Sequence, residues 1–367
     1  MHERPAYHGR HMNAAPTTGP RRRPRLLLYE MYDPAGIDSA PKVRIAMLGS
    51  ALERIADVER VQGGRMSRMR ASLRWWAGGG LRRVDAIYVE SSTTVASPFD
   101  LAFLAWARWN HRPVGVYFRD AYQLFRGVYP RTQGRQWLSD LAWRASLPIL
   151  RRLATVRYAP TDGLAQVLGL GSTVLLPPGG DPGSPDLGVG KMPVVAYVGA
   201  ANPADGFDGL IEAMAIVRAQ VPESRLVVVA PQLDPGFRPP SFMEYVQSGR
   251  SGLPTILAPV RVCVIPRPVN TYTDLAMPVK LREYLGLGKP VVATAARETA
   301  KVLEASGAGL TVADSPAAIA AGLLRLIEEP GLAESMGRNA RSFALGPDET
   351  WDTRAATVVA TLVESRS

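Results

Sequence analysis

A short segment late in the chain, MPVKLREYLGLGKPVVAT (residues 277–294), has the residue types and spacing of an anion site. Pro278 suits the first turn of a helix, and the free N–H groups and positive dipole end of such a turn attract anions. Lys280 falls in the same turn, where a cation is disfavoured by about 0.3–1 kcal/mol unless an anion such as a diphosphate is bound. Glu283 follows three residues later on the same helix face, where its carboxylate can accept from two ribose hydroxyl groups. One alternative stays open: Lys280 and Glu283 form a solvated pair on an ordinary amphipathic helix.

The composition is that of a globular enzyme. The chain has 367 residues, of which 46% are apolar and 21% charged, which excludes disorder over most of its length and suggests two to three domains. The single cysteine, Cys263, excludes a disulfide framework and a thiolate metal cluster. Three of the four histidines lie in the polar N-terminal tail, so we expect no zinc site in the folded body. We find no run of about 18 apolar residues and no apolar core of a signal peptide, and expect a cytoplasmic protein, peripheral at the inner face of the cell membrane.

The positive charge is concentrated in the first half of the chain. Residues 1–190 contain 26 Lys and Arg against 15 Asp and Glu, whereas residues 191–367 contain 17 against 18. Six of the seven tryptophans also lie in the first half. This pattern suggests contact with phospholipid headgroups, a phosphorylated acceptor or nucleic acid, although a genome that favours arginine over lysine would explain it too.

One basic, Trp-containing set of residues is a candidate surface for anionic lipid, with solvated helix faces as the alternative. It comprises Arg65, Arg68, Arg70, Arg74, Trp75, Trp76, Arg82, Arg83, Arg126, Arg131, Arg135 and Arg144. Because no nucleic-acid-binding signature accompanies the charge, no nucleic acid partner is expected.

Strand-like apolar runs alternate with helical patterns on both sides of a Pro- and Gly-rich linker at 176–193. Before it, we predict strands at 26–32, 84–90 and 113–120, and helices at 100–109 and 134–153, the second of which Pro148 should kink or end. After it, we predict strands at 194–200, 225–231, 261–268 and 290–294, and helices at 207–220, 278–287, 315–328, 330–344 and 349–364. This alternation predicts two α/β units of parallel βαβ type, which bind ligands at the carboxyl ends of their strands, in the cleft between them.

The 277–294 segment resembles the P-x-K-L-x-E-Y variant of the donor-site helix of GT-B glycosyltransferases of family 4, the group 1 glycosyl transferases. The resemblance continues through LPPGGD (176–181), VGAANPADGFDGLIEAM (198–214), AARETAKVLEASGAGLTV (295–312) and residues 315–341. It implies two Rossmann-like, doubly wound domains facing a cleft. The tail at 1–23, read as disordered, would precede an acceptor-binding domain at 24–187 and a donor-binding domain at 188–346, and the helix at 347–367 would return to the first domain.

The function implied by the resemblance is sugar transfer from a UDP- or GDP-sugar, hexosyltransferase-like and with retention. The acceptor would be a lipid-linked sugar, a polysaccharide or another cell-envelope component. No metal is implied, and no Asp-x-Asp metal motif is visible. Lys280 would contact the diphosphate and Glu283 the ribose, with the main chain of Pro278 and Val279 near the phosphate or sugar. Gly199 would let the first donor-domain loop approach the diphosphate.

The chain departs from the family pattern at several donor-site positions. The family's second glutamate is replaced by Leu275, with Asp274 beside it, and its Arg and Lys in the first donor-domain loop correspond to Ala200 and Asp205. Arg267 is our candidate replacement cation, because a guanidinium can grip phosphate with two donors; the alternative is a surface-loop arginine. These losses leave open a non-catalytic GT-B protein, or a basic module that binds nucleic acid or an anionic surface.

The first domain offers four candidate residues. Where many relatives place a histidine that faces the reacting sugar, this chain has Arg119 and Asp120. Asp120 would orient the acceptor hydroxyl or act as a base, or else cap the following helix. Glu90, at the end of a predicted strand, would belong to a helix-capping cluster or contact the acceptor. Gly36 lies in a loop that resembles the family's glycine-containing acceptor loop.

Overall fold

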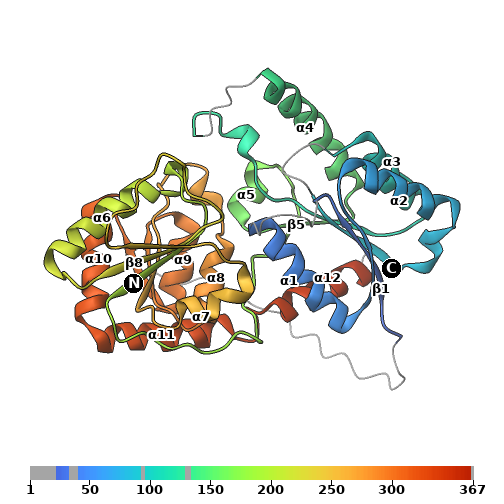
Figure 1. Cartoon of the computed structure of the whole chain (residues 1–367). Helices are drawn as coiled ribbons and strands as arrows, with labels where there is room; N and C mark the ends of the chain where they lie inside the picture. Colours follow the sequence, from blue (N-terminus) through green and yellow to red (C-terminus); the bar gives the residue numbers. More distant parts are fainter. Residues whose placement is uncertain (1–21, 33–39, 92–95, 129–133, 365–367) are drawn as a thin grey trace, which may run out of the picture.

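The computed structural model describes residues 22–32, 40–91, 96–128 and 134–364, without the side chains of 134–136 and 364. Within these residues the strands form two six-stranded sheets, in which all neighbouring strands are parallel (Figure 1). The predicted α/β class with two Rossmann-like domains is therefore confirmed. Most of the 1–23 tail, and the loop that contains Gly36, lie outside the described residues. Arg23 of the tail is bound to the first domain, where it donates to the carbonyl of Glu53 at 2.8 Å.

The first sheet has the strand order β2-β1-β3-β4-β5-β6. Its strands are β1 (Arg25–Glu30), β2 (Asp57–Val61), β3 (Ala86–Glu90), β4 (Val114–Tyr117), β5 (Val156–Ala159) and β6 (Val174–Leu175). The domain's helices are α1 (Ala40–Ile55), α2 (Arg65–Ala77), α3 (Pro98–Trp109), α4 (Gly134–Leu153) and α5 (Asp162–Val167). Alternate strand residues enter two cores, one shared with α3, α4 and part of α2 and the other with α1. One layer, α2–α4, thus covers one face of the sheet.

The second sheet has the order β12-β11-β10-β7-β8-β9. Its strands are β7 (Val194–Val198), β8 (Arg225–Val229), β9 (Met243–Val246), β10 (Val262–Ile265), β11 (Val291–Thr294) and β12 (Gly309–Val312). Its helices are α6 (Phe207–Gln220), α7 (Leu253–Leu257), α8 (Val279–Gly286), α9 (Arg297–Ser306), α10 (Pro316–Glu328) and α11 (Pro330–Ala344). The strand order reverses between β7 and β10, and in such sheets ligands bind beyond the carboxyl ends of the strands at this point.

The last helix, α12 (Trp351–Glu364), packs on the first domain. Trp351, Ala355, Val358 and Leu362 are buried in the core that α1 shares with the first sheet. These are the positions whose spacing predicted a core-facing stripe, and the predicted return of this helix is confirmed.

Most predicted elements are present, and α4 has the predicted range of 134–153. Of the two effects predicted for Pro148, an end of the helix is wrong, because α4 continues past it to Leu153. Pro148 lies on the exposed side of the helix, where water can satisfy the carbonyl that loses its partner. Short 3₁₀ turns also occur, and these are Gly80–Arg83, Tyr122–Leu124, Pro203–Asp205, Arg250–Gly252 and Thr273–Leu275.

Candidate active site

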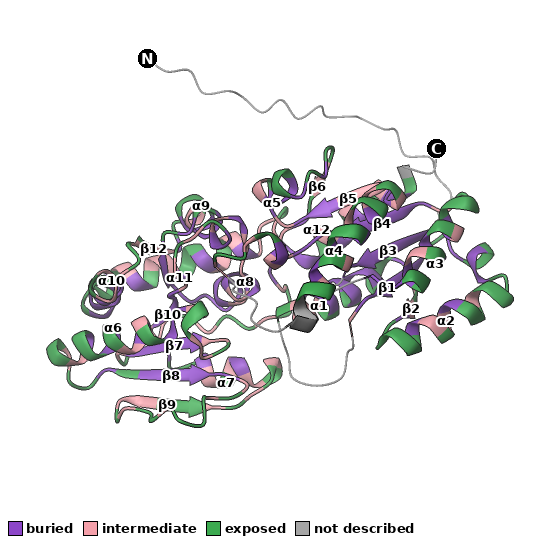
Figure 2. Cartoon of the chain, turned by 90° about the horizontal axis from the view of Figure 1, so that it is seen from above, coloured by how far each residue is buried: buried purple, intermediate pink, exposed green. Residues whose placement is uncertain are grey.

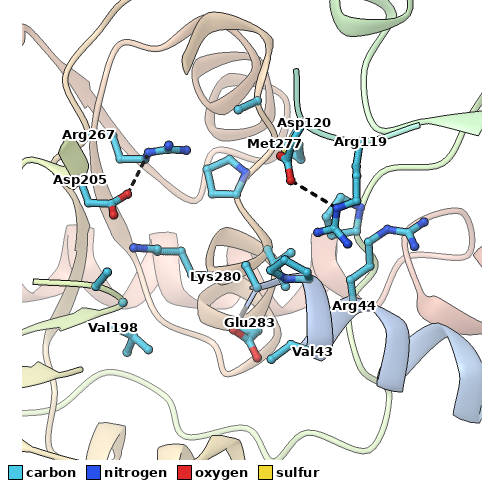
Figure 3. Close-up of a pocket in the computed structure, with 18 of the residues that line it drawn as sticks. Val43, Arg44, Arg119, Asp120, Val198, Asp205, Arg267, Met277, Lys280 and Glu283 are labelled. Atoms are coloured by element: carbon cyan, nitrogen blue, oxygen red, sulfur yellow. Dashed lines mark hydrogen bonds and ion pairs between the residues drawn. The ribbon is translucent and has the colours of Figure 1, made fainter. Parts of the chain in front are cut away.

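A cavity of about 680 Å³ lies between the two domains, a volume typical of small-molecule sites. Figure 3 shows charged side chains of both domains around it. The cavity is bordered by segments that follow β4, β7 and β10 and by the first turns of α1 and α8. The predicted site residues that line it are Arg119, Asp120, Gly199, Arg267, Pro278, Val279, Lys280 and Glu283.

The N-terminus of α8 points its first turn at the cavity. Pro278 is the N-cap rather than the first helical residue, with extended backbone (φ −67°, ψ 126°). The first-turn amides have no partner within the helix, and no acidic side chain lies in that turn. The dipole end and the Lys280 cation therefore combine to make this part of the cavity positive.

Lys280 is a cation held in partly desolvated surroundings. Its Nζ lies 4.5 Å from the centre of the Tyr197 ring, and no ion pair links it to any residue that the structure describes. Burial lowers the pKa of Lys280 to about 8, with Asp205 opposing the shift and Arg267 adding to it. The alternative interpretation, in which Lys280 and Glu283 form a solvated pair, is therefore wrong, because Lys280 is partly desolvated and Glu283 pairs with Arg250.

Gly199 ends β7 beside this lysine. Its φ of 144° is one that L side chains rarely adopt, and a Cβ at this position would lie 2.5 Å from the Lys280 Nζ. The neighbouring Val198 N–H donates to the Tyr284 hydroxyl of α8 at 2.8 Å. The end of β7 is thus fixed to α8, and glycine leaves the space that Lys280 occupies.

Arg267 follows β10 and also reaches the cavity. Its Nε lies 3.3 Å from Asp205 Oδ1, and its side chain is only 15% exposed. The surface-loop alternative is therefore wrong. Asp205, where the family pattern has lysine, pairs with the arginine that we expected to replace that lysine.

Glu283 is held by an arginine that the sequence did not reveal. Arg250 Nε donates to Glu283 Oε1 at 2.9 Å, and its Nη2 donates to Asp181 Oδ2 at 3.1 Å. The same guanidinium contacts the sulfur of Met47 on α1. Arg250 thus connects α8, the interdomain linker and the first domain. Of the residues that Arg250 contacts, the sequence marked Glu283 and Asp181, the latter within the PGGD segment, but not Met47.

Asp120 lies on the opposite wall, in an unusual backbone conformation with φ of 28°. The Tyr272 hydroxyl of the second domain donates to Asp120 Oδ1 at 2.9 Å, and Arg119 Nε lies 3.3 Å from its Oδ2. The capping alternative is wrong, because Ala121 is at the N-cap of the following 3₁₀ turn. Strained residues of this kind cluster at functional sites, where the surrounding structure holds them.

Glu90 lies behind the cavity wall. It is 2% exposed and pairs with Arg44 of α1, and the Tyr88 hydroxyl donates to it at 3.0 Å. The capping role predicted for it is wrong, because Ser97 caps α3. Glu90 also does not line the cavity, whereas Arg44 does. We therefore do not assign Glu90 a direct contact with the acceptor. Instead, its carboxylate pairs with Arg44, which lines the cavity.

Two absences hold within the described part of the chain. No group of three or more His, Cys, Asp or Glu is arranged to hold a metal ion. No described helix combines the length and apolar character that crossing a membrane requires.

Two Rossmann-like domains facing a cleft, with the last helix returned to the first, define a GT-B protein. Residues 192–329, most of the second domain, match the family model described as "Glycosyl transferases group 1". This match to the second domain confirms the resemblance to the group 1 glycosyl transferases seen in the sequence. A search of curated proteins gave no significant match.

Several solved structures share the fold. Sucrose-phosphate synthase from Thermosynechococcus elongatus is 16% identical, covers 94% of this chain and 99% of its own, and has a TM-score of 0.65. Anabaena HepE in complex with UDP is 16% identical, covers 93% and 100%, and has a TM-score of 0.64. An α,α-trehalose-phosphate synthase (UDP-forming) from Burkholderia vietnamiensis is 13% identical, covers 94% and 99%, and has a TM-score of 0.62.

Proposed function

We propose that the protein transfers a sugar from a nucleoside diphosphate sugar to an acceptor hydroxyl, with retention as the family resemblance implies. The observation that carries the proposal is Lys280, a partly desolvated cation at a helix N-terminus that faces the interdomain cavity. UDP is favoured over GDP because one similar structure contains UDP and another enzyme is UDP-forming.

In this proposal the donor binds against the second domain. The diphosphate accepts hydrogen bonds from the α8 amides and from Lys280, with Arg267 beside it, and Glu283 accepts from the ribose hydroxyls. As the bond from the sugar to the diphosphate breaks, negative charge grows on the leaving group. These positive groups are already in place and stabilise that charge, so we propose that no metal ion is required.

The acceptor binds against the first domain. Asp120 accepts a hydrogen bond from the acceptor hydroxyl and orients it, with Tyr272 holding the carboxylate from across the cleft. Arg119, whose Nε lies 3.3 Å from the Asp120 carboxylate, provides a cation near the reacting groups. A lipid-linked or other cell-envelope acceptor fits the basic, Trp-rich first half of the chain, and we propose no nucleic acid substrate.

The test is UDP binding by calorimetry together with UDP release and sugar transfer from a panel of UDP-sugars and GDP-sugars. Lys280→Met and Glu283→Ala should weaken UDP binding by at least about tenfold. Lys301→Met, which removes an exposed cation of α9 outside the cavity, should change nothing. Equal UDP affinity in all three variants would refute the site. UDP binding without turnover of any donor and acceptor would refute the transferase and support the non-catalytic alternative.

A further inference from the structure

The outer face of α4 is apolar where a surface helix is ordinarily polar. Trp137 and Leu141 are 59% and 54% exposed, while Trp143 and Leu150 on the opposite side enter the core. The exposed positions of this helix include Trp137, Leu138, Leu141, Ala145, Pro148 and Ile149, with the arginines Arg144 and Arg152 among them. An exposed apolar surface of this extent indicates an interaction site.

The neighbouring helices α2 and α3 also expose large apolar side chains. α3 packs beside α4, and α2 packs beside α3, in the layer that covers one face of the first sheet (Figure 2). Trp109 of α3 is 84% exposed. Large apolar side chains are also exposed on α2, namely Met66, Leu73 and Trp76. The layer α2–α4 therefore presents tryptophans on all three helices.

The exposed charges of this layer all have one sign. Its only acidic residues are Asp100 and Asp140, and both are buried. Asp100 is paired with Arg68 at 2.9 Å, so Arg68, which we counted toward a basic surface, does not contribute to it. The exposed charged side chains described on these helices are arginines: Arg65, Arg70, Arg74, Arg108, Arg144 and Arg152.

We propose that the outer surface of the α2–α4 layer docks on an anionic lipid bilayer. Tryptophan and leucine side chains would enter the boundary between headgroups and acyl chains, and the arginines would meet the anionic headgroups. A second copy of the chain fits less well, because it would bring arginine against arginine. Nucleic acid would pair with the arginines but offers no apolar phase for Leu138, Leu141 and Ile149.

The orientation of α4 connects this surface to the cleft. α4 follows β4, whose carboxyl end lies at the cavity, so the N-terminal part of α4 lies at the same edge of the sheet. A bilayer against Trp137, Leu138 and Leu141 would thus lie near the cleft. That the bilayer supplies a lipid-linked acceptor rests on the proposed function, whereas the docking itself does not.

The test is binding of the full chain to vesicles of phosphatidylcholine, with and without phosphatidylglycerol, at low and high salt. We expect binding only to the anionic vesicles, weakened by salt. Trp137→Gln/Leu141→Gln should weaken it by at least about tenfold. Arg70→Gln/Arg74→Gln/Arg108→Gln should weaken it on the order of 100-fold, because each basic residue contributes about fivefold near an anionic surface.

Matched controls come from the second domain. Ile216→Gln on α6 and Arg338→Gln on α11 also replace exposed residues and should leave vesicle binding unchanged. Thermal unfolding and UDP binding verify that each variant is folded, since none of these residues lines the cavity.

Four results would overturn the docking surface. They are no preference for anionic vesicles, equal binding by all variants, tighter binding to a single-stranded oligonucleotide, and self-association that is lost in Trp137→Gln/Leu141→Gln. Loss of UDP binding alone, with vesicle binding preserved, would count against the proposed function and leave the docking surface intact.

Discussion

Replacing Lys280 with methionine should raise stability and weaken donor binding at the same time. Burial lowers the pKa of Lys280 from 10.5 to about 8, which corresponds to an upper value of about 3 kcal/mol for keeping the charged form in the fold at pH 7. The Lys280 side chain is partly exposed in the cleft, and solvent there reduces this cost. We therefore expect the free energy of unfolding to rise by about 1–3 kcal/mol in Lys280→Met. Loss of a charge-assisted contact to diphosphate should cost about 1.5–3 kcal/mol, or roughly 10- to 150-fold in UDP affinity.

The pH dependence has a defined sign. The unfolded chain keeps the Lys280 proton up to its ordinary pKa of 10.5, whereas the folded chain loses it near 8. The contribution of Lys280 to stability therefore rises from pH 8 toward 10.5. Binding of the UDP diphosphate requires the protonated amine of Lys280, so the UDP affinity of the wild-type protein should fall as the pH rises above about 8. Lys280→Met should lose the pH dependence of UDP affinity and the part of the stability rise that comes from Lys280, whereas Lys289, whose pKa burial also lowers to about 8, still contributes its own part.

Lys289 provides a matched control, because burial also lowers its pKa to about 8. Its Nζ donates to the carbonyls of Ala258 and Val260 at 3.2 and 2.9 Å, and it does not line the cavity. Lys289→Met should therefore lower stability. Denaturant unfolding and UDP calorimetry measure both effects. If Lys280→Met also lowers stability, or binds UDP like wild type, Lys280 is structural and the reasoning is wrong.

Three further predictions concern residues in the cleft or directly behind its wall. Gly199→Ala places a Cβ 2.5 Å from Lys280 Nζ and should weaken UDP binding at least about tenfold by calorimetry, with strain of about 1–3 kcal/mol; unchanged affinity would refute the close approach. Tyr272→Phe removes the hydroxyl that donates to Asp120 and should lower kcat severalfold in steady-state assays without changing UDP affinity; an unchanged kcat would remove Asp120 from the mechanism. Glu90→Gln leaves a buried arginine without its charge partner and should lower the free energy of unfolding by about 3–5 kcal/mol in denaturant titrations; a change below about 1 kcal/mol would show that the pair is not needed.

The sequence was most informative where the pattern is local. The α8 segment combines a helix start, a lysine and a glutamate within a few residues, and the structure places Lys280 and Glu283 in one cavity. The Pro- and Gly-rich stretch between the two sheets and the apolar runs of the strands are also local signals. The stripe of Trp351, Ala355, Val358 and Leu362 correctly predicted a core-facing last helix.

What the sequence did not reveal depends on pairings between distant segments. Arg44 and Glu90 come from α1 and β3, and Tyr272 meets Asp120 from the other domain. Arg250 reaches Glu283 from a loop with no distinctive pattern. The sequence around a single charged residue does not indicate which distant residue it pairs with, so only the three-dimensional fold identifies these contacts.

The most direct test of the account is a crystal structure of the protein with UDP or a UDP-sugar. We predict the diphosphate at the first turn of α8, within hydrogen-bond distance of Lys280 Nζ, and the ribose hydroxyls on Glu283. A nucleotide bound elsewhere, or bound in the cleft without contact to Lys280 and Glu283, would contradict the central claim.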